Sequence, residues 1–270
     1  MQVIDPSVDN GGCFALGYGG SGTGKTHLAG TLGDIGYTLI IDADKGYKTL
    51  VKPNVPGITQ KMRDNLVICS IDQFKDLDTA YQLIHDNDPD KWSKALSTKD
   101  RKVAIEKPFD WAVWDTWSEM QWHMMQQLRK NENLLSPNMG KTIDFRKNVG
   151  IQHWGMLTDL NKLAIEQLRD VTYSGTINQL FLMQEKIDKN EDLGTVEKGP
   201  SIHGKMMAEM PTYFDIVFHT STDPVGNFMA STKRKAGWPA KTRLGEGQEY
   251  KNPTAKEVLG LCISCVNVAP

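Results

Sequence analysis

Eight consecutive residues near the start of the chain have the types and spacing of a phosphate-binding loop. They match the pattern G-x-x-x-x-G-K-[ST] in full and are Gly19, Gly20, Ser21, Gly22, Thr23, Gly24, Lys25 and Thr26. Glycines let the backbone turn its N–H groups toward phosphate oxygens, where side chains would block the approach. In such a loop the lysine reaches the β- and γ-phosphates, and the threonine hydroxyl ligates Mg²⁺. The pattern therefore predicts that the protein binds a nucleoside triphosphate together with Mg²⁺.

The residues that flank this loop fit a strand that leads into a helix. Residues 13–16 form a short apolar run suited to a buried strand, and residues 27–32 can open a helix. The positive end of that helix would add to the phosphate site. We include His27, which directly follows the loop, among the expected nucleotide contacts.

A second anchor for Mg²⁺ is expected at the end of another buried strand, where phosphate-loop proteins usually place an aspartate. The apolar run 109–114 ends at Asp115, which we predict to be this anchor. Asp115 could also cap the helix that is expected to begin near Trp117, and the two roles can coexist.

Three polar residues at predicted strand ends are candidates for acting at the γ-phosphate. Asp42 and Asp44 follow the apolar run 37–41, at the carboxyl end of a strand, where ligands bind in open α/β sheets. One carboxylate is enough to position the attacking water, and we expect Asp44 to be this base while Asp42 is the alternative. Gln184, after the apolar run 177–183, could contact the γ-phosphate through its amide, or it could be an ordinary surface glutamine.

Strands that alternate with helices predict an α/β fold with a mostly parallel central sheet flanked by helices. The run 65–71 is a further strand, and Asp72 is expected to cap the helix that follows. Residues 214–220 and 227–232 could pair as antiparallel strands, which would give the sheet a C-terminal antiparallel extension. Because we find no internal repeat and no linker-like segment, residues 1–270 are expected to form a single domain.

Several charged or glycine-containing segments break this pattern and are expected at the surface. They are a charged excursion that includes Trp92 (86–107), an exposed insertion (134–150), a loop (187–200) and a basic, irregular segment (233–247). Long connections of this kind often carry the binding function of a compact domain.

The composition is that of an ordinary globular protein, with 39% apolar and 24% charged residues in a chain of 270. A net charge of −2 argues against a chain-wide basic surface, so any nucleic-acid binding must use a local patch. No apolar run approaches the length that spans a bilayer, and the first residues lack a signal-peptide pattern. The cytoplasm is therefore the expected compartment, and no membrane partner is expected.

The ends of the predicted strands resemble those of RecA-type recombinases. Residues 40–44, Ile-Ile-Asp-Ala-Asp, look like the Ile-Asp-Ala-Glu segment in which the glutamate positions the attacking water. Residues 113–116 look like the hydrophobic-Asp-Ser magnesium strand, and residues 181–184 are similar to the strand whose terminal glutamine contacts the γ-phosphate. Asp44 departs from the pattern because it is shorter than glutamate by one methylene, about 1.5 Å of reach, so slow hydrolysis is expected.

More closely, the whole chain is similar to phage-encoded RecA-like AAA-type ATPases, some of which act as single-strand annealing recombinases. The shared features are a Gly-Lys segment at 203–205, the later Pro211 and Phe214-Asp215, and a Lys-x-Arg at 241–243. This resemblance implies a RecA-like P-loop core, ATP as the nucleotide, assembly of copies into a ring or filament, and residence in the host cytoplasm.

The resemblance also implies that a neighbouring subunit supplies a positive group to the nucleotide. We expect Arg243 to be this group. The other cations of the basic segment are Lys233, Arg234, Lys235 and Lys241. All of them could instead face DNA or lie on an ordinary solvated surface.

RecA-like proteins bind single strands through loops after the magnesium strand and after the glutamine strand. The corresponding segments of this chain are 134–150 and 186–205. The first segment contains the cations Lys141, Arg146 and Lys147. Phe145 and Trp154 lie near them in the sequence and could stack on bases. Acidic residues offset the lysines of the second segment. Single-stranded DNA is therefore the expected partner, besides further copies of the chain.

The function that we expect is ATP binding and hydrolysis by a RecA-like protein that acts on single-stranded DNA in phage recombination or replication. The alternative is a nucleotide-gated module that controls assembly or partner binding with little turnover. A third interpretation is a P-loop kinase for a small molecule, with segment 134–150 as its lid.

Overall fold

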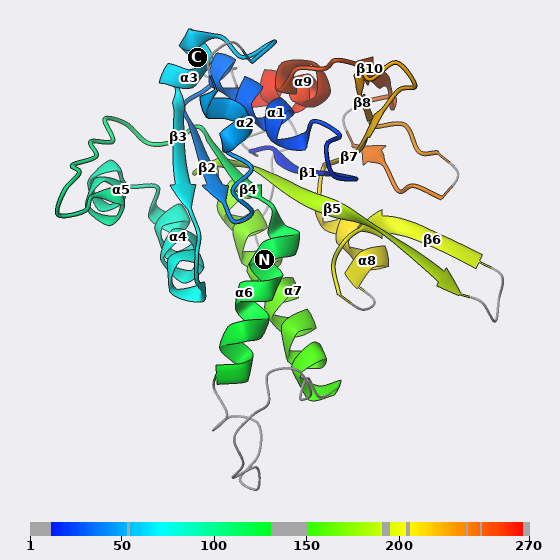
Figure 1. Ribbon diagram of the computed structural model, residues 1–270, viewed down its shortest axis with the longest axis horizontal. Helices are drawn as coiled ribbons and strands as arrows, with labels where there is room; N and C mark the ends of the chain where they lie inside the picture. Colours follow the sequence, from blue (N-terminus) through cyan, green and yellow to red (C-terminus); the bar gives the residue numbers. More distant parts are fainter. Residues whose placement is uncertain are drawn as a thin grey trace, which may run out of the picture.

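A ten-stranded β-sheet forms the centre of the protein (Figure 1). The computed structural model describes residues 12–52, 55–130, 151–190, 195–203, 206–235, 237–243 and 245–266. The strands are β1 (Phe14–Gly19), β2 (Thr38–Asp42), β3 (Leu66–Ser70), β4 (Trp111–Asp115), β5 (Asn178–Asn190), β6 (Thr195–Pro200), β7 (Ile216–Thr222), β8 (Phe228–Ser231), β9 (Lys241–Thr242) and β10 (Glu249–Lys251). The helices are α1 (Lys25–Gly30), α2 (Lys48–Val51), α3 (Gln60–Asp64), α4 (Phe74–Asp86), α5 (Pro89–Leu96), α6 (Trp117–Lys130), α7 (Ile151–Tyr173), α8 (Met206–Glu209) and α9 (Ala255–Val266), with 3-10 turns η1 (Thr31–Asp34) and η3 (Met210–Tyr213).

The sheet is mostly parallel, as the alternation of strands and helices predicts. Its strands run in the order β10-β8-β7-β1-β5-β4-β2-β3, and all neighbours from β7 to β3 are parallel. β1, β2 and β4 are buried along their whole length because helices cover both faces, which explains their unbroken apolar sequences. β8 and β10 add antiparallel strands beyond β7, so the expected C-terminal antiparallel extension is confirmed.

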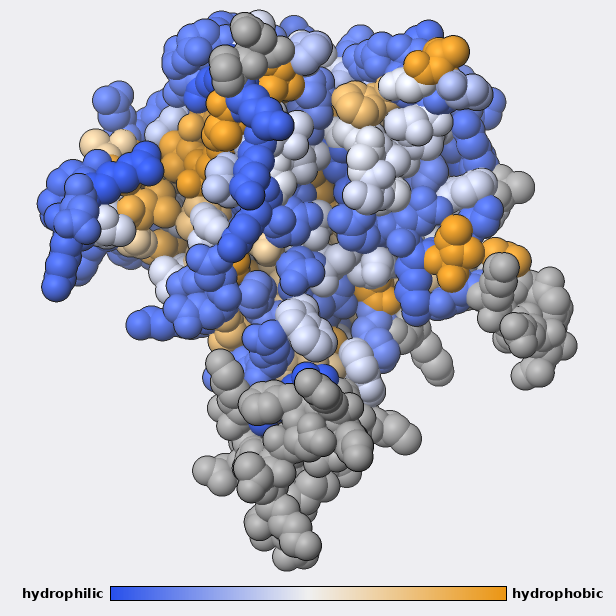
Figure 2. Space-filling view, in the orientation of Figure 1, coloured by the Kyte–Doolittle hydropathy of each residue, from blue (hydrophilic) through white to orange (hydrophobic). Residues whose placement is uncertain are grey.

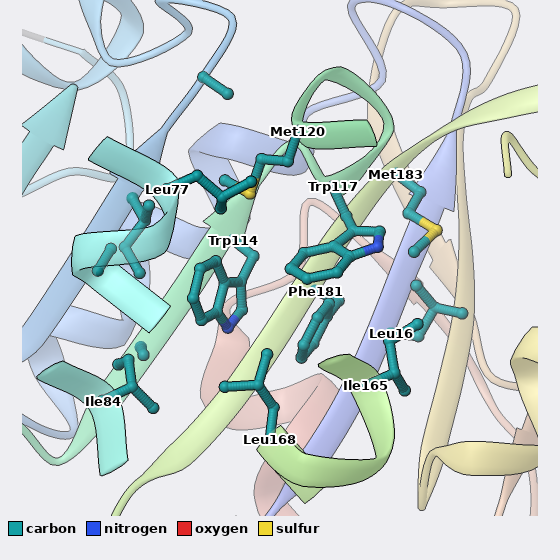
Figure 3. Packing of buried hydrophobic residues seen from close by; sticks show 14 of the residues in the cluster. Leu16, Leu77, Ile84, Trp114, Trp117, Met120, Ile165, Leu168, Phe181 and Met183 are labelled. Atoms are coloured by element: carbon teal, nitrogen blue, oxygen red, sulfur yellow. The ribbon is translucent and has the colours of Figure 1, made fainter. Parts of the chain in front are cut away.

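The two faces of the sheet carry separate hydrophobic clusters. On one face α4, α6 and α7 contribute to the cluster, and Figure 3 shows Trp114 and Trp117 beside Phe181 there. Their ring centroids lie 5.9 Å and 5.0 Å from that of Phe181. On the other face α1, η1, α3 and α9 contribute. The tryptophans around β4 therefore stabilise the sheet on which the site is built.

The charged segment 86–107 lies mostly at the surface, as its composition predicts, but it also contains the helix α5 and a buried tryptophan. The Asp88 carboxylate accepts hydrogen bonds from two backbone N–H groups and caps α5, whose first residue is Pro89. The helix turns Trp92 inward, where it is 1% exposed and packs edge-on against Phe109. The charges on the outer face of α5 masked this buried position in the sequence.

The segment 187–200 is not a loop. β5 continues to Asn190, and β6 returns beside it as an antiparallel hairpin that extends past the edge of the parallel sheet (Figure 1). Ile187 and Val196 are 52% and 46% exposed, and Figure 2 shows hydrophobic residues among hydrophilic ones on this hairpin. Because these two apolar side chains of the ribbon are exposed and its other residues are mostly charged, the sequence lacks the alternation of buried apolar and exposed polar residues that predicts strands.

The start of α4 also differs from the prediction, because Asp72 does not cap this helix. Gln73 is the N-cap residue, and the Asp76 carboxylate accepts the backbone N–H groups of Asp72 and Gln73. An acidic residue at the third helical position is a standard way to satisfy N–H groups at a helix start.

α6 and α7 form an antiparallel pair that projects from the body of the protein (Figure 1). Near the sheet, Nε1 of Trp117 in α6 donates to Oδ1 of Asn161 in α7 at 2.8 Å. The expected insertion 134–150 and Lys205 lie outside the described residues. None of the helices in the described part of the chain is long and apolar enough to cross a membrane.

Candidate nucleotide-binding site

The phosphate loop joins the end of β1 to the start of α1, as the sequence predicts. Gly22 and Gly24 have φ angles of 74° and 86°, a left-handed conformation that residues with a Cβ rarely adopt. A Cβ on Gly24 would also lie 2.7 Å from the ring of Phe228. The φ angles explain the need for glycine at both positions, and the contact with Phe228 adds a second reason at Gly24.

The loop opens into a cavity of about 460 Å³. Besides residues 21–26 of the loop and His27, the cavity is lined by Asp44, Gly46, Thr49, Val55, Pro56, Thr116, Gln184 and Phe228. Its volume lies in the range of cofactor sites, which is about 300–1,000 Å³. The fold thus brings together Lys25, Asp44 and Gln184, which are far apart in the sequence.

Lys25 is only 6% exposed, and its amine points into the loop. The amine donates to the backbone carbonyls of Gly19 at 2.8 Å and Gly20 at 2.7 Å, and it lies 3.4 Å from Oε1 of Gln184. Burial lowers the pKa of Lys25, while nearby carboxylates, first among them Asp115, oppose this shift. A buried amine that is held by weak acceptors is well placed to bind phosphate oxygens.

Thr26 and Asp115 meet at the foot of the cavity. The Thr26 hydroxyl donates to Oδ2 of Asp115 at 2.6 Å, whereas Oδ1 of Asp115 is buried and has no hydrogen-bond partner in the described residues. Burial raises the pKa of Asp115 to about 7, against the opposing effect of the Thr26 hydrogen bond. An unpartnered buried carboxylate oxygen costs free energy, and Mg²⁺ prefers hard oxygen ligands, so these two side chains fit the ion.

The rest of the Mg²⁺ coordination shell would come from phosphates and water. No cluster of three or more His, Cys, Asp and Glu side chains with the arrangement of a metal site occurs in the described ranges of the chain. Mg²⁺ is usually held by one or two carboxylates plus substrate phosphates rather than by an all-protein cage. The sparse donor set at Thr26 and Asp115 therefore suits a nucleotide-bound ion.

The two candidate bases lie in different environments. Asp42 is fully buried beside Asp115 in the sheet, and burial, with Asp44 nearby, raises its pKa to about 6. Asp44 is exposed, lines the cavity, and accepts the backbone N–H of Gly46 through Oδ1 at 2.9 Å. Of the two carboxylates, Asp44 is the one that lines the cavity.

Gln184 lies on β5 directly beside Gly19 of β1. Its backbone N–H donates to Oγ of Ser118 at 3.0 Å, and its carbonyl accepts the N–H of Ser201 at 2.6 Å. The side chain is half-buried and faces the amine of Lys25. The structure therefore places Gln184 in the cavity wall and not among freely exposed surface residues.

The family model AAA_24, described as an AAA domain, matches residues 14–244. The chain belongs to the AAA_24 family. The crystal structure of the RadB recombinase is similar with a TM-score of 0.49 and 14% identity, covering 89% of this chain and 86% of that chain. No curated protein matches the sequence. The part of the chain that matches the family includes every residue that lines the nucleotide cavity.

The sequence did not point to the apolar wall of the cavity in this AAA domain. The ring of Phe228, at the start of β8, lies 5.6 Å from the ring of His27, whose Nε2 is 2.6 Å from the carbonyl oxygen of Pro56. Val55, Pro56 and Phe228 together offer an apolar surface of the kind that holds a nucleobase. No motif marks these residues, because each is ordinary in its own segment.

A neighbouring strand fixes the other side of the loop. The hydroxyls of Thr23 and Thr220 lie 2.7 Å apart, and Thr23 also donates to the carbonyl of Gly20 at 2.9 Å. Thr220 belongs to β7 and pairs with Gly19, where an added Cβ would lie 2.2 Å from the Thr220 hydroxyl oxygen. β7 therefore holds the loop closely, a contact that the sequence alone does not reveal.

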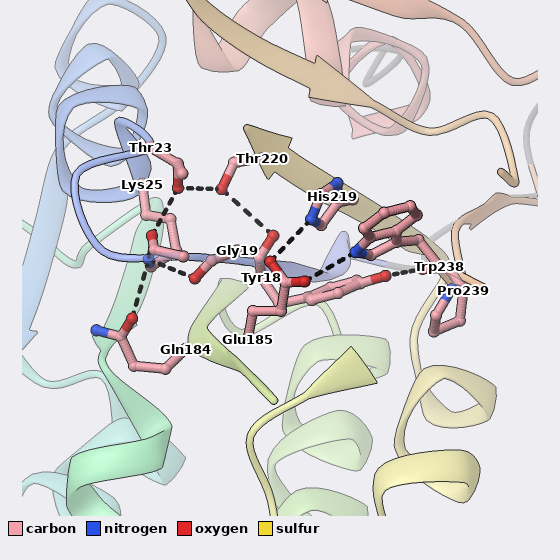
Figure 4. A network of polar contacts seen from close by, with 11 residues as sticks. Tyr18, Gly19, Thr23, Lys25, Gln184, Glu185, His219, Thr220, Trp238 and Pro239 are labelled. Carbon is pink, nitrogen blue, oxygen red and sulfur yellow. Dashed lines mark hydrogen bonds and ion pairs between the residues drawn. The ribbon is translucent and has the colours of Figure 1, made fainter. Parts of the chain in front are cut away.

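A polar network connects the same region to the basic segment (Figure 4). Glu185 of β5 accepts the Nε1–H of Trp238 at 2.9 Å and lies 3.3 Å from Nε2 of His219. The Tyr18 hydroxyl donates to the carbonyl of Pro239 at 2.7 Å. Burial lowers the pKa of His219 and outweighs the opposing effect of Glu185. The basic segment is therefore anchored to β1, β5 and β7 through Trp238 and Pro239.

Arg243 does not reach the nucleotide cavity of its own chain. Its guanidinium donates to Oδ1 of Asp215 at 3.2 Å and to the carbonyl of Thr212 at 3.1 Å. Asp215 precedes β7, and its N–H bonds the carbonyl of Phe14 at the start of β1, so Arg243 lies at the opposite edge of the sheet from the loop. Its expected role at a neighbour's nucleotide stays a prediction.

Proposed function

We propose that this protein is a RecA-like ATPase that binds ATP and Mg²⁺ at the phosphate loop and hydrolyses ATP to ADP and phosphate. The observation that carries this proposal is the contact of Thr26 with the half-partnered Asp115 carboxylate at the foot of the cavity. Such a pair beside the buried amine of Lys25 suits a metal-bound triphosphate far better than an uncharged ligand.

Each side chain has a defined task in this proposal. Lys25 binds the terminal phosphates, and Thr26 and Asp115 hold Mg²⁺, which neutralises part of the phosphate charge. Asp44 orients the attacking water and accepts its proton. Gln184 donates its amide N–H to the γ-phosphate while its amide oxygen faces Lys25.

We also propose that copies of the chain assemble into a ring or filament and act on single-stranded DNA, in recombination or replication of a phage within the host cytoplasm. The placement of Arg243 supports the assembly, because an arginine remote from its own nucleotide can serve the next subunit. The Gly-Lys segment at 203–205 and the Lys-x-Arg at 241–243 support the phage type of recombinase by resemblance.

A nucleotide-gated assembly module with little turnover is the second candidate. It is favoured by the short side chain of Asp44, which holds its carboxylate farther from the γ-phosphate than a glutamate would. The kinase interpretation depends on segment 134–150, which lies outside the described residues.

An ATPase assay with and without Mg²⁺ and single-stranded DNA tests the proposal. The wild-type protein should hydrolyse ATP only with Mg²⁺, DNA should raise the rate, and Asp115→Asn should abolish it. An ATP-dependent change of oligomer size without hydrolysis would favour the gated module instead. ATP binding by Lys25→Ala at wild-type affinity would show that the nucleotide binds elsewhere.

A further inference from the structure

A second cavity, of about 210 Å³, lies between the α6–α7 pair and the base of the β5–β6 hairpin. Gln121 and Trp122 of α6 line it together with Trp154 of α7, Lys186 of β5 and His203 beyond β6. The helix pair and the hairpin both project from the body of the protein and flank this cavity (Figure 1). The proposed hydrolysis reaction uses none of these side chains.

Three aromatic rings contribute to the wall of this cavity. The rings of Trp154 and His203 are stacked, with centroids 3.8 Å apart and an interplanar angle of 21°. Trp122 is 44% exposed, and the Arg129 guanidinium lies 5.1 Å from the centre of its ring. Exposed aromatic faces beside cations are the platforms on which proteins stack the bases of single strands.

The one charged side chain that lines the cavity in the described residues is a lysine. No Asp or Glu occurs among the described residues that line it, and Lys186 supplies a positive charge. The Lys186 amine pairs with Asp188 at 2.7 Å, at a half-exposed position where a phosphate can compete for it. Burial, aided by Lys186, lowers the pKa of His203, so its ring is neutral near pH 7 and stacks as a neutral aromatic.

Hydrogen bonds hold the cavity in shape without a ligand. The Gln121 side chain, 6% exposed, donates to the carbonyl of Ser201 at 3.1 Å and accepts the N–H of His203 at 3.2 Å. The Ser118 hydroxyl donates to the same Ser201 carbonyl at 2.9 Å and accepts the N–H of Gln184 at 3.0 Å. A wall that is fixed in advance loses little entropy when a ligand binds.

We propose that this cavity binds a nucleobase of single-stranded DNA. Trp122 and the Trp154–His203 pair stack on the base, while Lys186 and Arg129 contact the phosphates that flank it. This inference rests on the proposed action on single-stranded DNA and assigns that action to particular side chains. Stacking accepts every base, so the site reads little sequence.

Fluorescence anisotropy with a labelled oligothymidylate tests the proposal. A deoxyribose-phosphate strand of the same length without bases serves as the second probe, and both are titrated in the presence of Mg²⁺ and a non-hydrolysable ATP analogue. Trp122→Ala should weaken oligothymidylate binding about 5-fold to 150-fold, the effect of one lost stacking contact. The same variant should bind the abasic strand as the wild-type protein does.

Matched variants separate stacking from charge and from folding. Trp122→Phe keeps an aromatic face and should retain most of the affinity. Lys186→Gln should weaken binding of both strands and lower the slope of log affinity against log salt by about one. Leu163→Ala, at a 52% exposed position of α7 outside this cavity, should change neither probe. Circular dichroism confirms that each variant is folded.

The outcomes test the nucleobase assignment separately from the wider proposed function. Wild-type affinity of Trp122→Ala for oligothymidylate, or equal losses on both strands, would overturn the nucleobase assignment and leave a protein segment as the occupant. If the wild-type protein bound neither strand, the DNA part of the proposed function would fall with the pocket. ATP hydrolysis at the phosphate loop would stand in either case.

Discussion

Asp115 and Asp42 lie side by side in the sheet, and burial raises their pKa values to about 7 and about 6. In the unfolded chain both groups would titrate at the ordinary value of 3.8. Between about pH 4 and pH 7 the folded state therefore holds more protons than the unfolded state, and the free energy of unfolding falls as the pH rises. The buried carboxyls thus cost the nucleotide-free protein stability at neutral pH.

The isosteric variant Asp115→Asn makes this cost measurable. Asparagine keeps an oxygen for the Thr26 hydroxyl but cannot ionise, so the unfolding temperature should fall less steeply between about pH 5 and 7.5 than in the wild-type protein. Thermal unfolding followed by circular dichroism without Mg²⁺ measures both slopes. Equal slopes would mean that Asp115 is ionised throughout this range.

Asp44 reaches the cavity with a carboxylate on a short side chain. Asp44→Asn should lower ATP turnover about 10²- to 10⁴-fold and leave ATP affinity nearly unchanged, because a positioned base contributes that much to the rate. Asp44→Glu should keep or raise the turnover, since it gains about 1.5 Å of reach. Steady-state ATPase rates and binding titrations measure the two effects. Normal hydrolysis by Asp44→Asn, with a loss in Asp42→Asn, would make Asp42 the base.

At the scale of elements, α5 shows how a polar segment can hold a core residue. Its N-cap at Asp88 fixes where the helix begins, and this start sets which face turns inward. Trp92 is on that inner face, in contact with Phe109, which lies two residues before the start of β4. The helix therefore supports the strand that ends at Asp115.

Trp92→Ala should lower the free energy of unfolding by about 3–5 kcal/mol, because it removes a large, fully buried side chain. Trp92→Phe should cost much less, since Nε1 of Trp92 has no hydrogen-bond partner in the described residues and no bond is lost. Urea unfolding measures both values. Val225→Ala, at a position 81% exposed, is the control and should change stability by less than about 0.5 kcal/mol. An effect of Trp92→Ala as small as this control would mean that the Trp92 side chain does not belong to the core.

Over the whole molecule, the sequence predicts those strands and site residues that a short local pattern of residues marks. β1, β2 and β4 are buried on both faces, so their apolar runs are visible, and their ends identify Asp44 and Asp115 as candidates whose roles remain predictions. Trp92 and the β5–β6 hairpin escaped prediction because charged residues surround them. Phe228 escaped because its contact with Gly24 depends on how β8 folds back beside the loop, which no short pattern records.

The opposite positions of the phosphate loop and Arg243 lead to a prediction for the assembled protein. If each nucleotide is served by the next subunit's arginine, Arg243→Ala and Lys25→Ala should each be inactive alone. In an equal mixture that exchanges subunits, a site is complete when its own subunit keeps Lys25 and its neighbour keeps Arg243. Each condition is met half of the time, so the mixture should recover about a quarter of the wild-type ATPase rate.

The double variant Lys25→Ala/Arg243→Ala is the control, because it can supply neither group when mixed with Arg243→Ala. Asp215→Asn is a second test, because the Asp215 carboxylate accepts a hydrogen bond from the Arg243 guanidinium at 3.2 Å. Removing this charge should lower the ATPase rate without weakening ATP binding. Recovery in the first mixture and none in the control would require that subunits share sites. Full activity of Arg243→Ala in the assembled state would instead limit Arg243 to joining the segments around Asp215 and Thr212 at that edge of the sheet.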